Sequence, residues 1–171
     1  ETILREQQHA RAALRAAQIW ADAKQLDAAD HPYHWRKKIF SPAGVRVGVY
    51  PMKSENGTGY TYIKNTLLIP VKDGSKLHSL QAIFEDGQKH YLPGGKKSGC
   101  YFTLGKPDTR PVLICEGYAT ACSLHRATGW LTLAAFDAGN LQPVAEKTRA
   151  KLPNSKIIIC ADNDRWKKPD K

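Results

Sequence analysis

The first 30 residues carry small and apolar side chains at helical spacing. The side chains that share one helical stripe are Ile3, Ala10, Leu14, Ala17, Ala21 and Ala28. Their intervals of three, four or seven residues predict an amphipathic helix, or a pair of helices. A residue that precedes proline is disfavoured in the α conformation, so Pro32 predicts that this helical segment ends near residue 30 or 31.

A stretch with the pattern of β-strands follows. Its apolar or alternating runs are residues 45–49, 66–71 and 77–84, and its turns are residues 72–75 and 85–87. Successive strands joined by short turns predict an antiparallel meander, which closes on residues 90–92. A glycine-rich loop at 93–99 and a further apolar run at 100–104 complete this part of the chain.

From residue 111 onward, short apolar runs alternate with helical segments. The expected elements are a strand at 112–115, a helix at 119–128, a strand at 131–136, a helix at 141–152 and a strand at 156–161. Strands separated by helices of this length form βαβ units, which predict a parallel sheet covered on both faces. We therefore expect an α/β chain with an N-terminal helical segment (1–40), a β-rich subdomain (41–108) and a parallel α/β unit (109–171).

Composition adds a strong positive charge to this picture. The chain has 26 Lys and Arg against 16 Asp and Glu, a formal net charge of +10, which favours a polyanionic partner. The four cysteines lack metal-ligand spacing and are expected to be reduced. Without a long apolar run or a leader, we expect a cytoplasmic protein with no membrane partner. The start at Glu1 rather than Met predicts a piece of a longer protein.

Acidic residues stand at the ends of the three C-terminal strands. Glu116 follows the first strand, Asp137 the second, and Asp162 and Asp164 the third. Ligands of parallel sheets bind at the carboxyl ends of the strands, where these carboxylates would meet. Such a cluster suits Mg²⁺ or Mn²⁺, which prefer oxygen ligands. The alternative is that acids end these strands only because charge is well solvated there.

The same residues resemble the E-G and D-x-D motifs of the TOPRIM domain, which primases, topoisomerases and some nucleases share. The matching segments are residues 116–121, 135–141 and 162–164, and two upstream segments, 67–74 and 91–95, are similar to the part that precedes TOPRIM in bacterial primase cores. The amino-acid sequence of these segments looks like that of the primases of plasmids, phages and integrative elements, including conjugative ones. The segment from His31 to Lys38 also looks like the entry to that group.

The resemblance implies a nucleotidyltransferase that makes short primers on single-stranded DNA from nucleoside triphosphates. It implies that Asp162 and Asp164 bind Mg²⁺ or Mn²⁺ with Glu116, and that Glu116 is either a metal ligand or a general acid or base. Asp137 is a further candidate ligand. TOPRIM domains usually continue beyond the D-x-D strand, so activity is expected of the longer protein. A helicase domain or protein is a further candidate partner.

Basic residues supply candidate contacts to nucleotides or template. The loop with Gly94, Gly95, Lys96 and Lys97 can bring backbone amides and two ammonium groups to a phosphate. Arg36 and Lys37 lie among aromatic residues, an arrangement that suits the binding of single strands, and Arg165 follows the last acidic motif. The alternative for the loop is a plain turn, and the alternative for Arg36 and Lys37 is a solvated basic face.

For the function of the whole chain, the alternatives are a TOPRIM nuclease or topoisomerase, and a non-catalytic nucleic-acid-binding or docking fragment.

Overall fold

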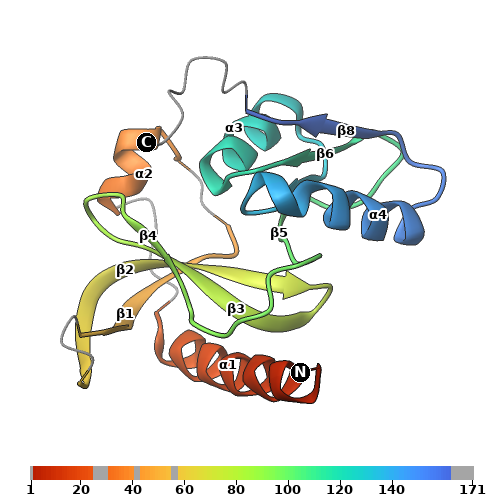
Figure 1. The fold of residues 1–171 in the computed structure, drawn as a ribbon. Coiled ribbons are helices and arrows are strands. Elements are labelled where there is room, and N and C mark those ends of the chain that lie inside the picture. Colours follow the sequence, from red (N-terminus) through yellow and green to blue (C-terminus); the bar gives the residue numbers. More distant parts are fainter. Residues whose placement is uncertain (1, 25–30, 41–42, 55–57, 163–171) are drawn as a thin grey trace, which may run out of the picture.

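The computed structural model describes residues 2–24, 31–40, 43–54 and 58–162. The helices are α1 (Thr2–Asp22), α2 (Pro32–Lys37), α3 (Tyr118–Thr128) and α4 (Leu141–Lys151), with a 3₁₀ turn, η2 (Ala138–Asn140). The strands are β1 (Arg46–Lys53), β2 (Tyr60–Asp73), β3 (Lys76–Ile83), β4 (Lys89–Tyr91), β5 (Phe102–Leu104), β6 (Val112–Cys115), β7 (Thr132–Ala134) and β8 (Ile157–Cys160). They form two four-stranded sheets (Figure 1).

The first sheet is the predicted antiparallel meander, with strand order β1-β2-β3-β4. Helix α1 covers one face, where Ala16 packs with Leu68, Leu80 and Leu92. Figure 1 shows α1 on the side of this sheet opposite α3 and α4. The small residues of the α1 stripe allow this close approach, because an alanine side chain lets the helix backbone lie near the strands.

The second sheet has the order β5-β7-β6-β8. Strand β6 is central and pairs in parallel with both β7 and β8. Helices α3 and α4 cover opposite faces, since Ala121 of α3 and Val144 of α4 belong to different core clusters on the two sides. The predicted βαβ arrangement, and with it the α/β fold class, is confirmed. Strand β5 is an addition to the predicted parallel sheet, because residues 102–104 pair antiparallel with β7 rather than with the meander.

The N-terminal helix is shorter than its sequence pattern predicts. It ends at Asp22, and Lys24 then forms an antiparallel bridge with Val47 at the edge of the first sheet. Pairing with β1 replaces the helical hydrogen bonds there. Pro32 begins α2, and the residue before it is outside the α region as predicted: His31 is extended, at φ −72° and ψ 132°, and its side chain caps α2. Residues 25–30, where the helical segment was expected to end, lie outside the described residues. Proline suits a first helical position because its missing N–H would lack a helical partner there.

The two sheets share one core. Leu67 and Val71 of β2 belong to the same buried cluster as Phe102 of β5 and Tyr118 of α3. Ion pairs reinforce this junction: the Asp73 carboxylate lies 2.5 Å from Nζ of Lys147 and 3.3 Å from Nζ of Lys151, both on α4. All four cysteines are free thiols in the structure. Among the described residues, no helix combines the length and apolar character that a membrane span requires.

Candidate functional site

Glu116 and Asp162 lie together at the carboxyl ends of β6 and β8. These neighbouring strands run in parallel, and Cys115 of β6 is in register with Cys160 of β8. The backbone N–H of Asp162 donates to Oε1 of Glu116 at 3.1 Å. The register therefore brings the E-G segment and the beginning of the D-x-D segment to one point, although 46 residues separate them.

The side chains here that could bind a metal ion are those of Glu116 and Asp162, which are joined through the Asp162 backbone N–H. Among the described residues, neither Glu116 nor Asp162 forms an ion pair with a cationic side chain. The part of the chain that the structure describes contains no group of three or more His, Cys, Asp or Glu arranged to hold a metal. Asp164 and Arg165 lie outside the described residues. Two carboxylates still fit Mg²⁺, which proteins often bind through one or two such groups together with substrate phosphates.

Asp137 lies three residues beyond the end of β7 and makes structural contacts. Its Oδ1 accepts the backbone N–H of Asn140 at 2.9 Å and thereby caps η2. Its Oδ2 forms an ion pair with Lys97. The preceding residue, Phe136, has φ 76°, a left-handed conformation that is rare for a bulky side chain and marks local backbone strain.

Asn140 joins the glycine-rich loop to the end of β7. The residue is only 3% exposed, and its Oδ1 accepts the N–H of Gly99 at 2.7 Å. Its Nδ2 reaches three backbone carbonyls, those of Ala135 at 2.7 Å, Cys100 at 2.9 Å and Lys97 at 3.2 Å. One buried amide thus fixes the loop beside the acidic edge of the second sheet.

The two lysines of the loop lie in different surroundings. Lys97 pairs with Asp137, whereas Lys96 lines a groove beside α1 together with Glu6 and His9. Gly95 approaches β3 closely, since a Cβ added there would lie 2.6 Å from the Cβ of Ser79. The structure therefore brings Lys97, but not Lys96, to the strand ends that carry the acidic residues.

Tyr91 supports Lys97 from the meander, and sequence reasoning missed this residue as part of the site. The Lys97 ammonium lies 4.9 Å from the centre of the Tyr91 ring. The phenol donates to the Phe136 carbonyl at 3.3 Å and accepts from Gln81 at 2.6 Å. Burial, with the Asp137 carboxylate nearby, raises the pKa of Tyr91 to about 12, so the phenol stays protonated. In the sequence, residues 91–95 carry only the resemblance to primase cores, which gives no signal for this contact.

A second missed residue is Lys89 of β4. Burial lowers its pKa, the Lys37 ammonium lowers it further, and the Asp162 carboxylate opposes both. These interactions place Lys37 of α2 and Asp162 each within electrostatic range of Lys89. A single lysine at the start of a short strand gives no sequence signal for such a role.

Helix α2 presents part of its predicted basic and aromatic surface. Tyr33 is buried at 2% exposure, whereas Trp35 is 67% exposed. Arg36 lies beside the turn at Gly87, where an added Cβ would meet its guanidinium at 3.3 Å. Buried His34 contacts the Tyr118 hydroxyl at 3.0 Å, which ties α2 to the first residue of α3, two positions after Glu116.

Comparison with known proteins places this geometry in a family context. Residues 110–166 match the model of the Toprim domain family. The chain is 44% identical over 139 residues to one Escherichia coli protein named DNA primase TraC, and 43% identical over 102 residues to another of the same name. These alignments cover 78% and 57% of this chain but only 9% and 10% of the respective relatives.

A solved structure agrees with the fold. The chain is similar to the RNA polymerase domain of Mycobacterium tuberculosis primase DnaG, with a TM-score of 0.54 at 15% identity, over 96% of this chain and 68% of that one. The chain thus spans about a tenth of the curated primases that it resembles and most of a known primase domain. The resemblance to TOPRIM primases that the sequence predicts is confirmed: residues 110–166 of this chain match the Toprim domain family, and the relatives that it resembles are named DNA primases.

Proposed function

We propose that this chain is the part of a DNA primase, encoded by a mobile genetic element, that joins nucleotides into short primers on single-stranded DNA. The observation that carries the proposal is the hydrogen bond from Asp162 N–H to Glu116 Oε1, which joins two acidic segments within the Toprim match. The primase relatives support the same class of reaction. The acting molecule would be the longer protein, to which this chain contributes the catalytic centre.

The acidic residues would have distinct tasks in this reaction. Glu116 and Asp162, with Asp164, would hold Mg²⁺ or Mn²⁺, and Asp137 is a further candidate once Lys97 releases it. When bound, the metal would neutralise phosphate charge and promote ionisation of the attacking hydroxyl. Glu116 would either serve as a ligand or accept the proton of that hydroxyl.

Cationic side chains around the acidic edge would hold the negatively charged substrates. Lys97 and Lys89 come from the meander side, and Lys37 from α2. Nucleoside triphosphates or the template strand would replace the present partners of these ammonium groups. The remaining candidates for nucleic-acid contact are Arg36, Gly94, Gly95, Lys96 and Arg165.

Metal binding can be tested on this chain by thermal melting. We expect Mn²⁺ to raise the melting temperature of the wild type, and Glu116→Gln combined with Asp162→Asn to remove the increase. Glu116→Gln keeps an oxygen that can accept the Asp162 N–H, so the local fold is retained. Glu146→Gln, an exposed change on α4, is the matched control. An equal Mn²⁺ effect in all variants would remove the metal site from the proposal.

Catalysis is best tested in the longer protein, with labelled nucleotides, Mn²⁺ and circular single-stranded DNA. Glu116→Gln should lower primer synthesis at least about 100-fold, the usual effect of losing one acid–base or electrostatic contribution. DNA cleavage without synthesis would support the nuclease or topoisomerase alternative. DNA binding without either reaction would support the docking alternative.

A further inference from the structure

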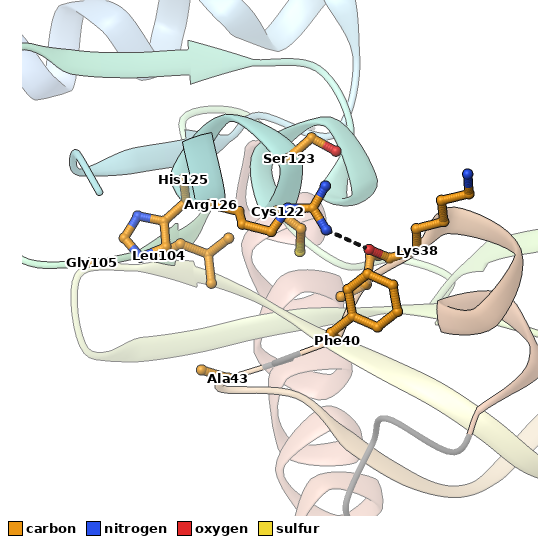
Figure 2. Close-up of a pocket in the computed structure, with 10 residues that line it drawn as sticks. Lys38, Phe40, Ala43, Leu104, Gly105, Cys122, Ser123, His125 and Arg126 are labelled. Carbon is orange, nitrogen blue, oxygen red and sulfur yellow. Dashed lines mark hydrogen bonds between the residues drawn. The ribbon is translucent and has the colours of Figure 1, made fainter. Parts of the chain in front are cut away.

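A pocket of about 270 Å³ lies between the C-terminal end of α2, the end of β5 and the outer face of α3 (Figure 2). Ile39, Leu104 and Cys122 contribute apolar wall, and the Phe40 side chain also lines the pocket. None of the acidic residues of the candidate site lines it. Its volume lies just below the usual range of about 300–1,000 Å³ for small-molecule sites, which limits the occupant to one compact ring system.

Phe40 and Arg126 form an exposed surface at this pocket. The Phe40 ring is 65% exposed, and the Arg126 guanidinium lies 5.7 Å from its centre. Arg126 also donates to the carbonyl oxygen of Lys38 at 3.1 Å, as the dashed line in Figure 2 shows. This bond uses one of five guanidinium N–H groups, so the cation is held in position with donors to spare.

The charge at the pocket is positive. The cationic side chains among the described residues that line it are Lys38 and Arg126, and none of these lining residues is a carboxylate. Burial raises the pKa of the Cys122 thiol to about 11, so the thiol is neutral at pH 7 and does not repel an anion. His125 Nδ1 is directed to the Trp130 carbonyl at 2.7 Å, which orients the imidazole at the end of α3.

We propose that this pocket binds a nucleoside phosphate, either a free nucleotide or the terminal residue of a single strand. The base would pack against Phe40 and the apolar wall, because aromatic side chains accept any base by stacking. Its phosphate would meet Arg126 and Lys38, whose charges an apolar peptide side chain would leave unused. Because cations rather than carboxylates hold the phosphate, binding needs no divalent metal and does not depend on the proposed metal site.

The test is calorimetric titration of the 171-residue chain with ATP in the presence of EDTA. Arg126→Gln and Phe40→Ala should each weaken binding about fivefold or more, the scale of one charge-assisted contact or one stacking contact. Arg11→Gln, an equivalent change at an exposed position of α1, should leave binding unchanged. Equal melting temperatures would establish that the variants are folded, and Lys38→Asn gives a second charge variant at the rim.

Other ligands show what the base and the phosphates each contribute to binding, and whether the natural ligand is a free nucleotide or a strand end. Adenosine and tripolyphosphate should each bind more weakly than ATP, because each lacks one half of the proposed ligand. A 5′-phosphorylated oligonucleotide that binds more tightly than ATP, and is displaced by it, would assign the pocket to a strand end, and the reverse order would assign it to free nucleotide. Absence of ATP binding in EDTA, or equal binding by all variants, would overturn the proposal, even where Mn²⁺ still stabilises the chain through the acidic edge.

Discussion

Replacement of Asn140 by alanine should destabilise the whole chain, because this one amide joins the glycine-rich loop to the second sheet. Its Oδ1 accepts one N–H, and the two N–H groups of Nδ2 are shared among three carbonyls. Alanine therefore removes three full hydrogen bonds at a 3% exposed position. At about 1 kcal/mol each, the free energy of unfolding should fall by about 3 kcal/mol.

Urea denaturation followed by circular dichroism measures this loss directly. For a chain of this length, about 3 kcal/mol corresponds to a fall of about 6–12 °C in melting temperature. The matched control is Asn154→Ala, in an exposed turn, which should change the unfolding free energy by less than about 0.5 kcal/mol. Asn140→Asp should be at least as harmful as alanine at pH 7, because a carboxylate would face three carbonyl oxygens. A loss below about 1 kcal/mol for alanine, or tolerance of aspartate, would refute the reasoning.

Three further predictions concern protonation, packing and charge. Burial lowers the pKa of His31, so folding favours its neutral form and stability is lost as the pH falls below the ordinary pKa of 6.5. The substitution His31→Asn keeps an oxygen that can cap α2 and should reduce this loss, as measured by urea denaturation at several pH values. Gly95→Ala should cost about 1–3 kcal/mol in the same assay, because its Cβ would crowd Ser79. Lys97→Ala should lower the salt dependence of single-strand binding by about 0.7 in log–log slope, while Lys96→Ala should not; equal slopes would contradict the different surroundings of the two side chains.

The elements after residue 111 could be predicted from sequence because each apolar run is short and bounded by a clear stop. Gly129 ends α3 in a left-handed conformation at φ 67°, and Pro153 follows α4. The end of α1 could not be predicted in this way, since the stripe of alanines continues past Asp22. There, pairing of Lys24 with the edge of the first sheet outweighs helical preference.

The candidate site could be predicted only where its residues follow strands. Glu116 and Asp162 end neighbouring strands, and a βαβ pattern brings such ends together. Lys89 and Tyr91 come from the meander, and their position depends on packing between the two sheets, which no local pattern encodes. The separation of Lys97 from Lys96 depends on the Asn140 hydrogen bonds, again a contact between distant segments.

The position of β5 sets a limit on how this protein can be divided. Residues 102–104 precede the Toprim match, yet they pair with the edge of β7 that faces away from β6 in the second sheet. A shortened Toprim piece that began at residue 110 would leave β7 with unpaired backbone groups, and open edge strands of this kind promote association with other chains. An expressible Toprim module should therefore begin upstream of Cys100, so that it brings its own edge strand.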